Sequence, residues 1–125
     1  MIITRQAVTS SGRLVGTNKL YSGDSVLEIP AIVIPASSTN YNILAAIDVS
    51  QVVAFHMQAN TALTVKTNSS SSPANTITLV ADQPYQFVTG DYNTFLLTTD
   101  VTSLFVTNSS AATTFYLLAE FDATL

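Results

Sequence analysis

Residues 52–67 read Val-Val-Ala-Phe-His-Met-Gln-Ala-Asn-Thr-Ala-Leu-Thr-Val-Lys-Thr. Within this stretch, Val53, Phe55, Met57 and Ala59 fall on one face of an extended chain, and Val52, Ala54, His56 and Gln58 fall on the other. Alternation with a period of two is typical of a strand that has one face in a hydrophobic core. The stretch therefore predicts two strands, separated by a turn near residue 60.

The same alternation recurs further along the chain, at Leu63, Val65 and Thr67, at Ile77 and Leu79, and at Phe115, Leu117, Ala119 and Phe121. Turn-forming residues separate these runs, at 68–75, 82–84, 90–93 and 108–112. Short strands spaced in this way form a sandwich or a barrel. We expect an all-β protein with antiparallel sheets.

Composition supports the same fold class. The chain has 125 residues, the size of one domain, and 47% of them are apolar while only 10% are charged. It contains 18 Thr and 14 Ser, which favour strands and turns over helices. It contains no cysteine, so neither disulfides nor thiolate metal sites are available.

The first 25 residues differ from the rest. Glycine and serine at 10–12, 16–18 and 22–24 interrupt any strand there, which predicts an extended N-terminal arm or irregular edge over residues 1–25 and a sandwich over residues 26–125. The first 19 residues contain Arg5, Arg13 and Lys19 and no carboxylate, whereas the remainder has eight carboxylates against Lys66, a net charge of −7. Such asymmetry is compatible with a basic arm that contacts an acidic neighbour, which could equally be the chain's own body.

Two further features concern the path of the chain. Residues 26–35 carry Pro30 and Pro35, which confine a strand to an edge or bulge, and we expect this segment to bend between the two sheets. Residues 63–70 are echoed by residues 104–110, both ending in Asn-Ser-Ser, which predicts two hairpins of related design. Asp48 and Asp100 are expected to terminate or cap turns.

Residues that could perform catalysis or bind a cofactor or metal are few. His56 is the only histidine, no nucleophile elbow or phosphate-binding glycine loop occurs, and the carboxylates are scattered. Glu120 and Asp122 lie two apart, and we expect both on the solvent side of an edge strand. We predict no enzyme and no catalytic, cofactor-binding or metal-binding residue. His56 is interpreted as a surface or interface histidine, with a pH-sensitive contact as the alternative.

Partner binding is the remaining possibility. Tyr85 and Tyr92 lie beside turn residues and are candidates for sugar binding or subunit contacts. Adjacent leucines at 96–97 and 117–118 exceed what one inward face needs, which indicates a surface covered by another subunit. Four Lys and Arg are too few to neutralise nucleic-acid phosphates. The apolar runs are shorter than the roughly 20 residues of a membrane helix, and the start does not look like a secretory signal.

The stretch from Ala62 to Asp122, with its runs Ala-Leu-Thr-Val-Lys-Thr-Asn-Ser-Ser and Asp-Val-Thr-Ser-Leu-Phe-Val-Thr-Asn-Ser-Ser, resembles small structural proteins of tailed phages. These are the capsid cement or decoration proteins of jelly-roll type. The resemblance implies a jelly-roll-like sandwich made in the host cytoplasm and placed on the virion surface. It also implies a homo-oligomer, often a trimer, that binds the major capsid protein across capsomer junctions. It supplies no functional residue.

Two other functions remain open from the sequence. One is a receptor- or carbohydrate-binding module of a phage fibre or tail, acting through the tyrosine-bearing loops. The other is a capsid shell subunit. For the decoration protein, the expected contact residues are Arg5, Arg13 and Lys19 on the arm, with Tyr85 and Tyr92.

Overall fold

The structure is a computed structural model that describes residues 2–8, 14–22 and 25–122. The described residues form ten strands and one short 3₁₀ turn, η1 (Val49–Gln51). The strands are β1 (Ile2–Val8), β2 (Leu14–Ser22), β3 (Ser25–Ile34), β4 (Tyr41–Ile47), β5 (Val52–Ala59), β6 (Leu63–Thr67), β7 (Thr76–Leu79), β8 (Tyr85–Val88), β9 (Val101–Thr107) and β10 (Thr113–Phe121). The all-β prediction is confirmed.

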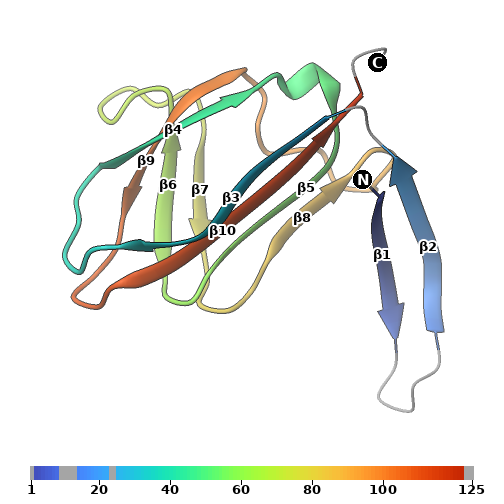
Figure 1. Ribbon diagram of the computed structural model, residues 1–125, viewed down its shortest axis with the longest axis horizontal. Helices are drawn as coiled ribbons and strands as arrows, with labels where there is room; N and C mark the ends of the chain where they lie inside the picture. The colour runs from blue at the N-terminus through green and yellow to red at the C-terminus, as the bar shows by residue number, and fades with distance from the viewer. Residues whose placement is uncertain (1, 9–13, 23–24, 123–125) are drawn as a thin grey trace.

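Eight of these strands form two four-stranded antiparallel sheets (Figure 1). Sheet I has the order β3-β10-β5-β8, and sheet II has the order β4-β9-β6-β7. The nested pairs β3/β10, β4/β9, β5/β8 and β6/β7 are all hydrogen-bonded, as in one long hairpin rolled up on itself. This arrangement is a jelly roll, so the predicted antiparallel sandwich is confirmed.

The core lies between the inner faces of the two sheets. Sheet I contributes Phe115 and Leu117 from its central strand β10, and sheet II contributes Leu104 and Val106 from β9; all four are almost completely buried. Because side chains alternate along a strand, every second residue of β5, β6 and β10 enters this core, as the period-two pattern predicts. Burial of these apolar faces is the main force that holds the sheets together.

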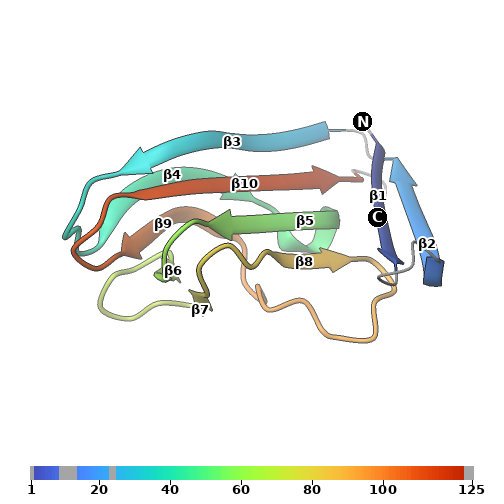
Figure 2. The ribbon, with the colours of Figure 1, turned by 90° about the horizontal axis from the view of Figure 1, so that it is seen from below.

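The N-terminal segment differs from the expected arm. Strands β1 and β2 pair as a separate two-stranded antiparallel sheet, which we call the N-terminal ribbon. Figures 1 and 2 show it at the end of the sandwich where β3 begins and β10 ends. A glycine within the expected arm, Gly16, lies inside β2. One glycine weakens a strand without preventing it, because cross-strand pairing of its neighbours compensates.

The sequence analysis expected residues 26–35 to bend between the two sheets. The structure shows that this prediction is wrong. Residues 26–34 belong to one ten-residue edge strand, β3 (Ser25–Ile34), and Pro35 follows its end. The pairing with β10 shifts register between Phe115 and Leu117, so that Pro30 and Ala31 together lie opposite a single residue. Proline lacks an amide donor, and the bulge absorbs this loss without ending the strand.

A second bulge corrects the predicted faces of β5. Glu120 pairs with Ala54 and Phe121 pairs with Val52, so Val53 is the extra residue. Val52 therefore belongs to the core cluster, whereas Val53 is buried outside it. The sequence analysis placed these two valines the other way round, because strict alternation takes no account of an inserted residue.

The two Asn-Ser-Ser echoes are both turns, but only the first closes a hairpin. β6 and β7 pair directly, whereas β9 lies in sheet II and β10 in sheet I, so the second turn crosses between sheets. Its Asn108 accepts a hydrogen bond from Ser38 N (2.8 Å) and donates to Pro35 O (2.9 Å) and Ala111 O (3.2 Å). This amide ties the β9–β10 corner to the β3–β4 connection.

Replacing Asn108 by alanine is expected to lower the free energy of unfolding by about 1–3 kcal/mol, because backbone groups on two connections lose their partner. Asn108→Asp keeps the acceptor for Ser38 N and should cost less than Asn108→Ala. Asn93→Ala, in an exposed loop position, is the matched control and should change stability by at most about 0.5 kcal/mol. Urea denaturation of the three variants measures their free energies of unfolding. An equal loss of stability in Asn93→Ala and Asn108→Ala would contradict the bridging role of Asn108.

Candidate functional site

The cations expected to contact a partner belong to the N-terminal segment. Arg5 and Lys19 occupy directly opposed positions in the register of β1 and β2. Arg13 lies outside the described residues. Like charges at opposed positions of an antiparallel pair are unfavourable. The contact itself stays a prediction.

Tyr85 lies on β8 and is half-buried in an aromatic cluster. Its ring stacks near that of Phe95 (centroids 6.5 Å apart) and is tilted against that of Phe55 (5.9 Å). The amide of Leu96 donates a hydrogen bond of 2.9 Å to the tyrosine hydroxyl. Burial raises the pKa of Tyr85, and this hydrogen bond opposes the rise. Tyr85 thus fastens the long loop (residues 89–100) to sheet I; whether it also contacts a partner stays a prediction.

Tyr92 is fully exposed in the same long loop. A tyrosine in this position can stack on a sugar ring or enter a pocket on another protein, because its body is apolar and its end is polar. Leu96 in this loop is half exposed. The other leucine that suggested a covered surface, Leu118, is already buried within this chain. Of the two predicted tyrosines, Tyr92 is the more exposed.

A polar row on the outer face of sheet I was not predicted. The register places Glu28, Leu118, His56 and Gln86 side by side across four strands. His56 contacts Gln86 (Nδ1 to Nε2, 3.0 Å) and Gln58 (Nε2 to Oε1, 3.3 Å), which fixes its ring between two amides. The sequence analysis found the alternation of His56 and Gln58 but could not align them with Glu28, because that requires the strand order.

Tyr116 completes the row. Its hydroxyl donates to Glu28 Oε2 (3.1 Å), and its ring meets that of His56 edge-on at 5.7 Å. Burial raises the pKa of Tyr116, and the hydrogen bond and negative charge of Glu28 raise it further. The row, which we call the outer polar row (Glu28, His56, Gln58, Gln86 and Tyr116), presents an aromatic ring among amide and carboxylate groups. This is chemistry that suits a sugar or a polar protein surface.

Glu120 corrects another expectation. It is fully buried rather than on the solvent side of an edge. β10 is a central strand and not an edge, and Val26 of β3 and Ala54 of β5 flank Glu120 on both sides. Sequence spacing alone could not distinguish a central strand from an edge.

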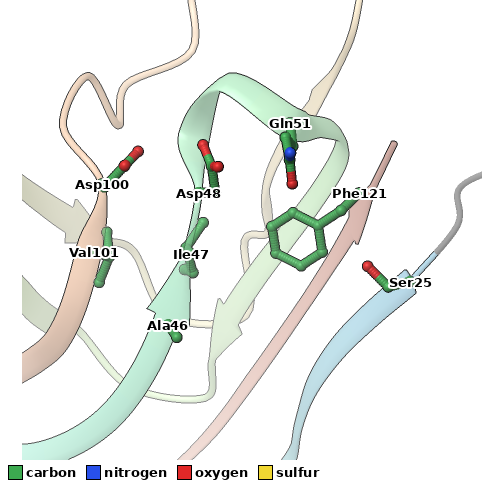
Figure 3. A pocket seen from close by; sticks show the side chains of 8 residues that line it. All are labelled: Ser25, Ala46, Ile47, Asp48, Gln51, Asp100, Val101 and Phe121. Carbon is green, nitrogen blue, oxygen red and sulfur yellow. The ribbon is translucent and has the colours of Figure 1, made fainter. Parts of the chain in front are cut away.

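A hollow of about 400 Å³ opens at the end of the sandwich where β4 leads into η1 (Figure 3). Ile47, Val101 and Phe121 are among the apolar residues that line it, and Asp48 and Asp100 lie beside them. These surroundings fit an aliphatic chain that ends in a cation.

Both carboxylates also have a structural role. For Asp48 it is the turn capping that the sequence analysis predicted, whereas Asp100, expected to cap the turn before its own strand, instead binds the start of η1. Asp48 Oδ1 accepts from the amide (3.2 Å) and the hydroxyl (2.7 Å) of Ser50, and Asp100 Oδ1 accepts from the amide of Val49 (3.0 Å). Both aspartates therefore cap η1.

Metal-binding groups of three or more His, Cys, Asp or Glu are absent from the part of the chain that the structure describes. In the same residues, no helix has the length and apolar character that a membrane span needs. The surfaces described above consist of isolated carboxylates, amides and aromatic rings. These groups can form hydrogen bonds and stack on flat rings.

Comparison with known proteins finds no matching family model, no matching curated protein and no matching solved structure. The likeness to phage decoration proteins therefore stays an expectation drawn from residues 62–122. A jelly roll hosts many unrelated functions, so its presence does not identify one.

Replacing Glu28 by glutamine is expected to lower the pKa of Tyr116, because a negative charge beside the phenol is removed. The pKa should stay above the ordinary 10.0, since burial is the larger cause of the shift. A pKa raised by folding contributes stability below about pH 10 that is lost as pH rises through the raised value. Ultraviolet titration of tyrosinate, with Tyr116→Phe to assign the signal, measures the shift. If the pKa of Tyr116 is the same in the Glu28→Gln variant, the contact between Tyr116 and Glu28 is contradicted. Tyr85 is the internal control, because the shift of its pKa does not involve Glu28.

Proposed function

We propose that this chain is a non-enzymatic structural protein of a phage virion: a cement or decoration protein that binds the outer capsid shell. The supporting observation is the division of the chain into an acidic jelly-roll body and a separate basic ribbon. The ribbon shares no sheet with the body, so its own pairing does not depend on strands of the sandwich. It can therefore be used to contact a second protein.

Charge supports a protein partner with carboxylates on its surface. The first 19 residues carry three cations and no acid, and two of the cations are directly opposed in the ribbon. An acidic patch on the major capsid protein would relieve their repulsion. The remaining chain carries a net charge of −7, which keeps the sandwich itself away from that patch and orients the molecule.

The mechanism that we propose is mechanical. Each copy bridges neighbouring capsomers on the virion surface and binds the assembled shell better than its separated parts, which stabilises the shell by mass action. Apolar contacts contribute about 25 cal/mol per Å² buried, before the cost of ordering. Many small contacts, repeated over a shell by homo-oligomers such as the trimer that the resemblance implies, add up to substantial resistance to internal pressure.

The test is co-sedimentation of the full chain with empty shells of the virus that encodes it. The triple variant Arg5→Gln, Arg13→Gln, Lys19→Gln removes three cations, each of which would contribute about 0.5 kcal/mol as an ion pair at the partner's surface. We expect roughly tenfold weaker binding. Lys66→Gln, which removes the one cation of the sandwich, is the matched control and should bind as the unchanged chain does. Undiminished binding by the triple variant would show that the ribbon is not the part that binds the shell. If the unchanged chain did not bind, the shell would be excluded as its partner.

The outer polar row supports a second candidate, a receptor- or carbohydrate-binding module of a fibre or tail. Tyr116 and its neighbours offer a stacking ring beside hydrogen-bonding groups, and Tyr92 is exposed elsewhere. A glycan array separates the two functions. Sugar binding that Tyr116→Ala abolishes, together with no affinity for shells, would favour this module over the decoration protein.

A shell subunit is the remaining alternative. Mild dissociation of native particles distinguishes it from a decoration protein. Release of the chain from shells that stay intact would exclude the shell subunit, whereas collapse of the shell on its removal would support it.

A further inference from the structure

The two sheets of the sandwich leave four edge strands, and three of them are protected against pairing with another chain. β7 and β8 have only four residues each. The long loop is also fastened along their side: Leu96 N donates to the hydroxyl of Tyr85, and Thr98 exchanges two hydrogen bonds of 3.0 Å with the Asn75 side chain. Short or covered edges do not template new strands.

β3, the free edge of sheet I, is protected differently. It carries Pro30 in its middle, where the amide donor is missing, and the bulge at Pro30 and Ala31 twists it. Its Glu28 is exposed and charged. Proline, bulges and charge are the usual devices that prevent edge-to-edge pairing.

β4, the free edge of sheet II, has a bulge but neither of the other two devices. Its seven residues, Tyr-Asn-Ile-Leu-Ala-Ala-Ile, contain no charge and no proline. Four of them, Tyr41–Leu44, pair with β9 in regular register, and a bulge follows at Ala45 and Ala46. Leu44 has 82% of its surface exposed and Tyr41 has 39%, although both are large and apolar.

We propose that β4 pairs antiparallel with β4 of a second copy of this chain, about a two-fold axis that passes at Leu44. Leu44 then lies opposite itself, Ile43 opposite Ala45, and Asn42 opposite Ala46. Ala45 is buried and Ile43 is partly buried in the core, whereas Asn42, Leu44 and Ala46 are exposed, so each pair joins residues of the same face. Because strand pairing requires matching faces, β4 is complementary to itself.

Charge does not prevent a second copy from meeting this edge. Each chain carries a net charge of −4, so two copies repel unless they meet at a neutral surface. β4 is such a surface, and its pairing would join two copies of sheet II into one eight-stranded sheet. Two exposed leucines would become a cross-strand apolar pair, the kind that stabilises antiparallel sheets.

The size of the contact sets its strength. A seven-residue strand is roughly 23 Å long, and the bulge shortens its regular ladder further. The interface is thus at the lower end of the range for specific complexes, and the dimer should depend on protein concentration. This two-fold contact is separate from a trimer and does not rest on shell binding; in a virion it would link copies of neighbouring oligomers.

Disulfide trapping tests the contact, because the chain has no cysteine of its own. In the full chain carrying Leu44→Cys, the axis brings the two thiols together at the spacing of opposed residues, which suits a disulfide. Val80→Cys is the matched control. Val80 is 55% exposed and follows β7, which is the other edge strand of sheet II. Under mild oxidation, Leu44→Cys should form a covalent dimer about tenfold faster or more. Equal rates for the two variants would overturn the proposal.

Sedimentation velocity gives an independent readout. Leu44→Lys places two like charges at the axis and should abolish the concentration-dependent dimer, whereas Val80→Lys should leave it unchanged. An unchanged chain that stays dissociated from other copies at all concentrations, or a dimer that survives Leu44→Lys, would overturn the contact. Neither result bears on shell binding by the ribbon, so this proposal and the proposed function fail separately.

Discussion

The structure depends on one constraint: every backbone amide and carbonyl in a sheet needs a partner, and a rolled-up hairpin satisfies this except at its edges. The nested pairs β3/β10, β4/β9, β5/β8 and β6/β7 meet the constraint inside the sandwich. The same pairing leaves four edge strands open. The length, charge, proline content and bulges of each edge strand then decide where a strand of another molecule can pair.

Local pattern was sufficient for the fold class. Period-two alternation marked β5, β6, β7 and β10, and hydroxyl-rich turns marked their ends. It failed wherever one inserted residue changed the register, as at Val53 in β5 and at Pro30 and Ala31 in β3. A bulge depends on which strands become neighbours, and this information is not local. For the same reason, two turns with related sequences, after Asn68 and Asn108, close a hairpin in one case and a corner between sheets in the other.

The candidate sites also divide into features that local sequence pattern predicts and features that depend on strand order. Asp48 was predicted as a turn-capping residue because capping within a turn is a local interaction, and it caps η1. Asp100 also binds η1, but across 51 positions of sequence, so local pattern could not indicate this contact. The outer polar row joins Glu28, His56 and Tyr116, which lie far apart in the sequence and meet through the order β3-β10-β5. Glu120 is buried on a central strand, and the spacing of residues along the sequence does not indicate which strands are central. The N-terminal cations were recognised from the sequence, but the opposed positions of Arg5 and Lys19 became known only from the pairing of β1 with β2.

The central claim is that this jelly roll works by presenting surfaces to other proteins on a shell. Cryo-electron microscopy of native particles that carry the full chain tests it most directly. The account predicts an eight-stranded sandwich on the outside of the shell, with the N-terminal ribbon against the capsid protein. Particles without this density, or with the ribbon turned toward solvent and another face of the sandwich on the shell, would contradict it.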